Sequence, residues 1–209
     1  AWSIKKLHRT IMLSSAYQMS SRFNKTGFGK DGDNVLLWRF SPQRLTVENW
    51  RDALLSVTGE LDRKLGGPPV DNILGTKRRT MYAKVSRAGD RFSSDTFLRL
   101  FDFPVPRASS AGRVTSIVPQ QFLFMMNSPF MAERASALAA RLEREAKDDT
   151  ARIELAYRLL YGRSPKAEEK QLGLEFLSAK ADKTDKIAVS RWQQYAQVLL
   201  SSNEFMYVQ

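Results

Sequence analysis

Residues 119–146, with the sequence PQQFLFMMNSPFMAERASALAARLEREA, decide the fold class of this chain. Apolar residues recur there three and four positions apart, which is the pattern of an amphipathic helix. We therefore predict one long helix over 119–146. Pro129 marks the point at which this helix would break, because proline has no backbone N–H group to donate.

The helical pattern continues from this stretch to the end of the chain. A helix is predicted over 149–161, and Gly162 is expected to end it because glycine readily adopts a left-handed backbone. The motif SPKAE at 164–168 has the spacing of an N-cap, a first-turn proline and a capping glutamate. It opens a predicted helix that reaches about residue 181, and a last helix is expected over 186–202.

The part of the chain before residue 119 mixes helices with long loops. The expected elements are a first helix capped by Ser3, a helical pattern from Pro42 that Gly66-Gly67 ends, an extended segment over 79–86, a short helix over 97–101, and loops over 26–34 and 104–116. We therefore predict a mainly α fold. It is an irregular single domain over 1–209 with six or seven helices, a minor extended or β element near 79–86, and long loops.

Positive charge is concentrated in the first half of the chain. The net charge is +11, and residues 1–113 carry 20 Lys and Arg against 10 Asp and Glu. Residues 114–209 are almost neutral, with 13 against 12. A basic half beside a neutral one predicts an acidic or polyanionic partner for the basic half, and a solvated surface without a partner is the alternative.

The composition removes many kinds of catalytic site. The chain has no cysteine and one histidine, His8, so it cannot form a thiolate nucleophile, a disulfide or a covalent haem attachment. A Ser-His-Asp triad would have to use His8, which shares the apolar side of the first predicted helix. We expect His8 to be a hydrogen-bonded, partly buried structural residue. No catalytic residue and no metal ligand is predicted.

Two clusters of charged residues are the candidate sites. Glu48 and Asp52 lie one helical turn apart, with Arg44 and Arg51 on adjacent turns. Paired carboxylates can perform acid–base chemistry, but the adjacent arginines favour a structural charge network. The second cluster is a candidate anion-binding or partner-binding site, formed by Lys77, Arg78, Arg79 and Arg113. Gln121 and Asn127 are expected to bond to nearby backbone.

The first helix carries an unusually wide apolar stripe. Ile4, Leu7, Ile11 and Met12, together with Trp2, make a stripe wider than a solvated helix needs. We expect part of it to be exposed, and coverage by the C-terminal helices is the alternative. The same segment carries cations within an amphipathic pattern, which differs from a signal peptide.

Several sequence blocks together resemble a known family. They are Trp2-Ser-Ile-Lys-Lys-Leu-His-Arg9, Leu37-Trp38-Arg39, Arg51-Asp52-Ala53-Leu54, Arg78-Arg79-Thr80-Met81-Tyr82, Phe101-Asp102 with Pro104, Arg113-Val-Thr-Ser-Ile-Val-Pro119 with Gln121, and Met126-Asn127-Ser-Pro-Phe130. Two further blocks are Gly162-Arg163-Ser-Pro165 and, at the end of the chain, Asn203-Glu204-Phe205-Met-Tyr-Val208. In this order they resemble the domain of unknown function 1553 family, which is abundant in planctomycetes.

The resemblance implies a context rather than a reaction. Such domains usually lie at the C-terminal end of exported multidomain proteins, in the periplasm or cell envelope, often with a cytochrome c-like domain upstream. It implies that haem would belong to that upstream domain and that this chain holds no cofactor. Family members also carry further residues before the Trp2 block, so the resemblance implies that the chain is truncated at its N-terminus.

These observations favour a non-catalytic accessory or interaction domain of a larger cell-envelope protein. Its partners would be upstream domains of the same polypeptide, or an anionic polymer. One alternative is part of a polysaccharide-acting enzyme completed by other segments. The other is a nucleic-acid-binding module, which the basic charge favours but no binding motif supports. No membrane span is predicted, because no apolar run approaches the roughly 18 residues that one requires.

Overall fold

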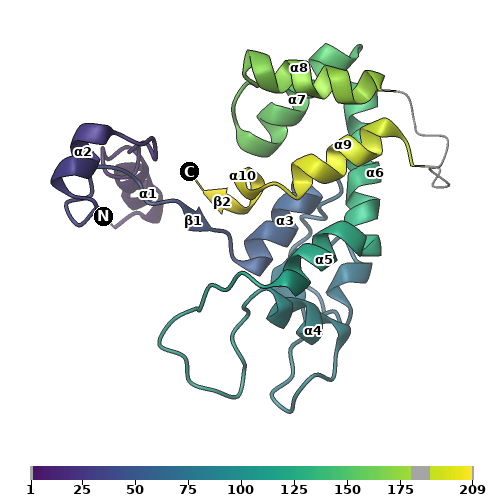
Figure 1. Cartoon of the computed structure of the whole chain (residues 1–209). Helices are drawn as coiled ribbons and strands as arrows, with labels where there is room; N and C mark the ends of the chain where they lie inside the picture. Colours follow the sequence, from purple (N-terminus) through teal and green to yellow (C-terminus); the bar gives the residue numbers. More distant parts are fainter. Residues whose placement is uncertain (1, 180–188, 209) are drawn as a thin grey trace. The chain divides into compact units, whose positions relative to one another are not determined.

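The structure, a computed structural model, describes residues 2–179 and 189–208. It comprises two compact units, and Figure 1 shows their elements. Unit 1 consists of Ala1–Arg44 with Tyr207–Gln209, and unit 2 of Leu45–Met206. The boundary between the two units, after Arg44, differs from the point after Arg113 at which the basic half of the sequence ends. A single domain over 1–209 stays a prediction.

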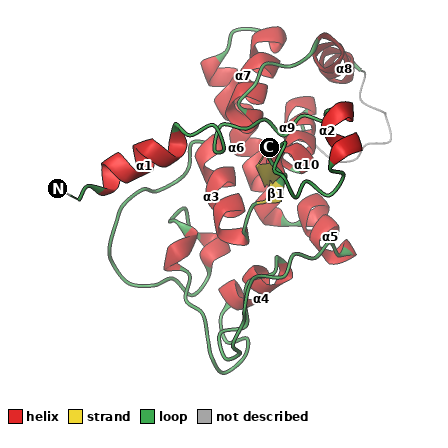
Figure 2. Cartoon of the chain, turned by 90° about the vertical axis from the view of Figure 1, so that its left-hand side faces the viewer, coloured by secondary structure: helices red, strands yellow, loops and turns green. Residues whose placement is uncertain are grey.

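Unit 1 holds two short helices and a small sheet. Its elements are α1 (Ile4–Met12), α2 (Lys25–Lys30) and the antiparallel pair β1 (Gln43–Arg44) and β2 (Tyr207–Val208). The Ser3 hydroxyl accepts a hydrogen bond from the Lys6 amide at 3.4 Å, which confirms the predicted cap. The Asn24 side chain caps α2 in the same way, so the loop predicted over 26–34 is wrong in its first half. Figure 2 shows α1 and α2 well apart, so they do not pack on each other.

The elements of unit 2 are helices joined by long loops, as the colouring of Figure 2 shows. Its elements are α3 (Val47–Val57), the 3₁₀ turns η1 (Ile73–Gly75) and η2 (Thr80–Tyr82), α4 (Ser93–Leu100), α5 (Pro119–Asn127), α6 (Pro129–Glu145), α7 (Asp149–Tyr161), α8 (Ala167–Ser178), α9 (Arg191–Leu200) and α10 (Asn203–Met206). The mainly α prediction is therefore confirmed. The described residues form ten α-helices rather than six or seven, because the helix predicted over 119–146 is two helices, α2 lies in a predicted loop, and α10 follows the last predicted helix.

The stretch over 119–146 forms two helices that meet at Ser128. The Ser128 backbone is extended, and its hydroxyl accepts a hydrogen bond from the Met131 amide at 3.2 Å. Pro129 then occupies the first turn of α6, where its missing N–H group leaves no acceptor unpaired. The predicted break at Pro129 is confirmed.

α6 supplies the centre of the core of unit 2. Leu138 and Leu142 are fully buried on one face of this helix. α9 packs against α6, and its Gln193 amide donates to the Ser136 hydroxyl at 2.9 Å. Each fully buried leucine stabilises the fold by about 2 kcal/mol relative to an exposed one. The α6–α9 pair therefore joins the middle of the sequence of unit 2 to its C-terminal part.

Aromatic rings form the lower part of the same core. Phe97 of α4, and Phe101 directly after this helix, each lie 5.5 Å, between ring centroids, from Phe124 of α5. Trp50 of α3 lies 4.6 Å from Phe101. Phe130, at the start of α6, lies 6.3 Å from Phe97 and completes the cluster. These contacts fix α3, α4 and α5 against the start of α6.

Other predicted boundaries need correction. The segment 79–86 contains the 3₁₀ turn η2 and an isolated bridge between Val70 and Ala83 instead of a strand. α3 begins at Val47, not at Pro42, because the Thr46 side chain caps it. α8 begins at Ala167 and uses Glu169, one residue after the predicted glutamate, to complete its cap. The helix over 149–161 ended by Gly162 is confirmed. Residues 181 and 186–188 of the predicted last two helices lie outside the described residues.

An arginine clamp ties the loop before α8 to α10. Arg163 donates to the Glu169 carboxylate at 2.7 and 2.8 Å and to the Glu204 carboxylate at 2.6 and 2.7 Å. These bonds from Arg163 lower the pKa of Glu169 to about 2, although partial burial acts against the shift. Bidentate arginine–carboxylate bonds are among the stronger polar contacts in proteins. The clamp thus joins segments about forty residues apart in the chain.

We predict that the clamp makes stability depend on acidic pH. Because the pKa of Glu169 is lower in the folded chain than the ordinary 4.5, its contribution is complete above pH 4.5. That contribution is lost as the pH falls from 4.5 towards 2. Glu169→Gln should therefore lose about 1–2 kcal/mol at neutral pH and show a flatter decline in this window, measured by urea unfolding.

Glu168→Gln is the matched control, since Glu168 is exposed one position earlier. It should follow the wild type at every pH. Parallel declines of wild type and Glu169→Gln between pH 4.5 and 2 would contradict the clamp's role.

Candidate functional site

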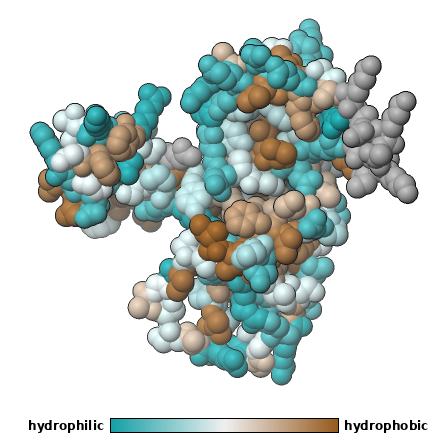
Figure 3. All heavy atoms as spheres, in the orientation of Figure 1, coloured by the Kyte–Doolittle hydropathy of each residue, from teal (hydrophilic) through white to brown (hydrophobic). Residues whose placement is uncertain are grey.

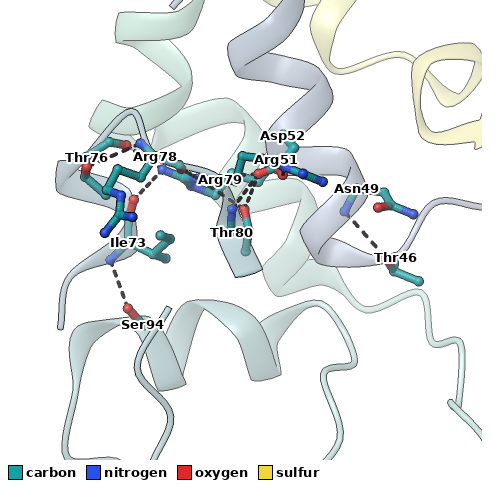
Figure 4. A network of polar contacts seen from close by, with 10 residues as sticks. All are labelled: Thr46, Asn49, Arg51, Asp52, Ile73, Thr76, Arg78, Arg79, Thr80 and Ser94. Carbon is teal, nitrogen blue, oxygen red and sulfur yellow. Dashed lines mark hydrogen bonds and ion pairs between the residues drawn. The ribbon is translucent and has the colours of Figure 1, made fainter. Parts of the chain in front are cut away.

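The centre of the charged region is a fully buried arginine. Arg51 lies on α3 with 0% of its surface exposed, beneath the segment 73–80. Its guanidinium donates to the Arg78 carbonyl at 2.9 Å and to the Thr80 hydroxyl at 3.1 Å (Figure 4). It also donates to the carbonyls of Ile73 and Thr76. Burial lowers the pKa of Arg51 to about 10, so the side chain stays charged at neutral pH.

Asp52 holds the same segment from the next position of α3. Its carboxylate accepts from the Thr80 amide at 2.7 Å and from the Thr80 hydroxyl at 2.6 Å. The Arg79 guanidinium lies 3.4 Å from the same carboxylate, and that of Arg51 lies 3.8 Å away. Asp52 is thus engaged by the chain itself, and its contacts position backbone (Figure 4).

Glu48 has a different partner, Arg113 in the long loop before α5. The two side chains form a bidentate pair with N···O distances of 2.7 and 2.6 Å. The Arg113 guanidinium also lies 5.3 Å from the centre of the Phe103 ring. Burial acts to raise the pKa of Glu48, but the hydrogen bonds from Arg113 outweigh it, and the pKa lies below its ordinary value. Glu48 is therefore a carboxylate at neutral pH.

The four residues of the predicted charge network lie in three separate places. Arg51 and Asp52 converge on Thr80, whereas Glu48 joins Arg113, a residue that we assigned to the other cluster. Arg44 lies in unit 1, at the end of β1, where it pairs with Tyr207. The carboxylates of Glu48 and Asp52 therefore serve two separate arginine contacts.

The predicted anion-binding cluster is engaged within the chain. Lys77 lies 3.1 Å from the Glu60 carboxylate, and Arg79 pairs with Asp52. Arg78 donates to the Pro68 carbonyl at 2.7 Å and stacks on Tyr82, with 3.8 Å to the ring centre. These contacts hold the 66–69 turn against the segment 77–82. A role in binding an external anion stays a prediction.

The three residues predicted to be structural have different environments. Gln121 is buried, and its amide donates to the Leu100 carbonyl at 2.9 Å, as expected for a side chain that bonds to backbone. Asn127 is exposed at the last position of α5. His8 is also exposed, so its predicted partial burial is wrong. The reason is that no residue of α1 is buried, although the helix is strongly amphipathic.

Cations without an ion pair among the described residues occur in unit 2 as well, Arg87 and Lys147 among them, but those of unit 1 gather in one segment that has no carboxylate. Residues 2–30 contain six Lys and Arg and no Asp or Glu: the cations are Lys5, Lys6, Arg9, Arg22, Lys25 and Lys30. None of the six forms an ion pair with another residue of the described chain. The net charge of residues 1–113 does not reveal this segment, because all ten acidic residues of that half follow residue 30. A count over shorter windows would have found it. These unpaired cations were not among the predicted site residues.

Two surface hollows lie near charged residues. The larger, of about 790 Å³, is formed by unit 1 and lined by Arg22, Lys30 and Phe23 beside Trp38. The second, of about 380 Å³, is formed by the loop 102–114 and has Arg99 at its edge. Neither hollow is lined by Glu48 or Asp52. Among the described residues, no three His, Asp or Glu side chains gather as a metal site would require.

Comparisons with known proteins identify a family and no relative of known activity. Residues 1–177 match the family model described as PSD1, protein of unknown function (DUF1553). No curated protein and no solved structure matches the chain. None of the helices in the described ranges is both long and apolar enough to cross a bilayer.

We predict that Arg51 stabilises unit 2 far more than the exposed cations near it. Arg51→Met leaves two buried and two partly buried acceptors without their donor, and should cost about 3–5 kcal/mol in the free energy of unfolding. Arg79→Met is the matched control, because Arg79 is 46% exposed and has one ion pair. It should cost less than about 1 kcal/mol. If urea unfolding shows that both variants lose the same free energy of unfolding, the buried contacts of Arg51 add no stability beyond that of an exposed ion pair.

We also predict a modest energy for the Glu48–Arg113 pair. The side chains are 24% and 39% exposed, so water weakens their attraction. A double-mutant cycle of Glu48→Ala and Arg113→Ala, followed by urea unfolding, should give a coupling energy of about 1 kcal/mol. A coupling energy of zero would mean that the contact does not hold the loop in solution.

Proposed function

The chain belongs to the DUF1553 family of proteins of unknown function, and on that premise we propose that it is a non-catalytic interaction domain. In this proposal it is an accessory part of a larger cell-envelope protein. Its basic N-terminal part docks on an acidic partner domain or an anionic polymer. The location in the cell envelope rests on the family resemblance alone.

The unpaired cations of residues 2–30 are the observation that carries the proposal. Six cations without a single carboxylate among the first thirty residues create a positive potential that nothing in that segment neutralises. In unit 2, by contrast, Arg51, Arg113 and Arg163 each bond to acceptors within the chain. Charges that stabilise a fold find internal partners, whereas unpaired charges of one sign are available to a partner of the other sign.

Contacts within the chain favour one part of the basic half as the docking surface. Lys77, Arg78 and Arg79 were expected to take part, but each is engaged by Glu60, the 66–69 turn or Asp52. Using them for docking would require breaking those contacts. The proposal therefore assigns docking to the cations of residues 2–30.

A polyanion-binding experiment tests this proposal. Dextran sulfate and polyglutamate are suitable probes for an anionic polymer and an acidic protein surface, with neutral dextran as a negative control. We expect binding at about 50 mM salt that weakens steeply at about 300 mM, because binding releases counterions. Replacing Lys5, Lys6 and Arg9 together by Gln should weaken it at least about tenfold.

The matched control removes the same charge from unit 2. Arg87, Arg107 and Lys147 are exposed, and their triple replacement by Gln should leave binding within about twofold of the wild type. If both triple variants lose the same binding affinity for the polyanion, binding depends on net charge alone. That result would overturn the assignment of docking to residues 2–30. Tighter binding to duplex DNA than to either probe would favour the nucleic-acid alternative instead.

A further inference from the structure

The two faces of α1 differ sharply in chemistry. With 100° between successive residues, Ile4, Leu7 and Ile11 fall on one face, with His8 and Met12 beside them. Lys5, Lys6 and Arg9 gather on the opposite face. An apolar face backed by Lys and Arg is typical of helices that lie in the plane of a membrane surface.

The apolar face of α1 is open to solvent. No residue of the helix is buried, and the apolar side chains range from 45% exposed at Leu7 to 68% at Ile4. Trp2, just before the helix, is 93% exposed. Figure 3 shows apolar atoms in brown at the surface of unit 1, next to hydrophilic ones. An exposed apolar stripe of this kind marks an interaction surface.

A loop of unit 1 exposes a second apolar group. Val35, Leu36 and Leu37 are 76%, 79% and 64% exposed. The Asp31 carboxylate holds the loop by accepting from the amides of Val35 at 3.0 Å and Leu36 at 2.6 Å. Leu37 has a φ of 54°, a left-handed conformation that is unfavourable for a residue other than glycine. The backbone is thus held in an unfavourable conformation while three aliphatic side chains face water.

The charges of unit 1 decide which partner fits these apolar groups. A second copy of the chain packed on the apolar stripe would cover Ile4, Leu7 and Ile11 but would leave Lys5, Lys6 and Arg9 of both copies without a counter-charge, since residues 1–30 hold no carboxylate. An anionic bilayer offers both an apolar interior for the stripe and negative headgroups for the cations.

We infer that unit 1 binds the surface of anionic membranes. α1 lies in the interface with Ile4, Leu7 and Ile11 directed into the acyl region and its cations among the headgroups. The Val35–Leu37 loop inserts as a second anchor. This inference concerns surface attachment and does not depend on the proposed docking of a soluble partner.

Flotation of the complete chain with lipid vesicles tests the inference. The probes are vesicles of phosphatidylcholine with about 30% phosphatidylglycerol, and vesicles of phosphatidylcholine alone, at about 0.1 M salt. We expect strong flotation only with the anionic vesicles. The triple Gln variant of Lys5, Lys6 and Arg9 should partition about 100-fold more weakly, since each cation near an anionic surface strengthens binding about fivefold.

Two apolar variants separate insertion from simple charge attraction. Leu7→Gln with Ile11→Gln keeps every charge and should reduce partitioning at least about tenfold, and Val35→Ser with Leu36→Ser should reduce it severalfold. The matched control is Leu172→Gln with Val198→Gln, because these residues are 66% and 62% exposed in unit 2. It should float like the wild type. Because all these side chains are exposed, circular dichroism should show the same fold in each variant.

Several results would overturn the inference. Wild-type chain that stays in solution with anionic vesicles would do so, and would point to a protein groove as the partner of α1. Undiminished flotation of the Leu7→Gln, Ile11→Gln variant would also overturn it, and so would a dimer in solution that this variant abolishes. Since the variant keeps its charges, it should still bind dextran sulfate, so a failure here is distinguishable from a failure of the proposed function.

Discussion

A buried guanidinium organises the charged half of unit 2. Arg51 sits beneath the segment 73–80 with no exposed surface and donates to three carbonyls and one hydroxyl. A buried charge is costly unless its hydrogen-bonding groups find partners, so the backbone around Arg51 curls to supply acceptors. Asp52 closes the same segment from outside by binding Thr80. This is why residues 80–82 form a 3₁₀ turn within the segment 79–86, for which alternation of side chains predicted a strand or an extended segment.

Two groups of basic residues in the chain differ physically. In unit 2, arginines such as Arg51, Arg113 and Arg163 are structural, because each bonds to acceptors contributed by distant parts of the sequence. In residues 2–30 the cations have no carboxylate within the segment and no ion pair within the described chain. Net charge alone does not distinguish these groups, whereas the partners of each side chain do.

Sequence patterns predicted the elements whose signals are local. The cap at Ser3, the break at Pro129 and the stop at Gly162 each depend on a few neighbouring residues, and all three are confirmed. The pairing of Glu48 with Arg113 was out of reach, because 65 positions separate them along the chain. The burial of Arg51 was equally hidden, since its acceptors are mostly backbone carbonyls, which no side-chain pattern records. Exposure of His8 followed from packing that the helix itself does not specify.

The central claim is that residues 2–30 bind an external partner, whereas the arginines of unit 2 stabilise the fold. Hydrogen exchange with and without a polyanion tests this claim most directly. Exchange of the complete chain would be followed by mass spectrometry with and without dextran sulfate. The account predicts that added protection is confined to residues 2–30. It also predicts that the Thr80 amide, which donates to Asp52, is already protected without the polymer. New protection centred on residues 77–79 and 113, with none in residues 2–30, would contradict it.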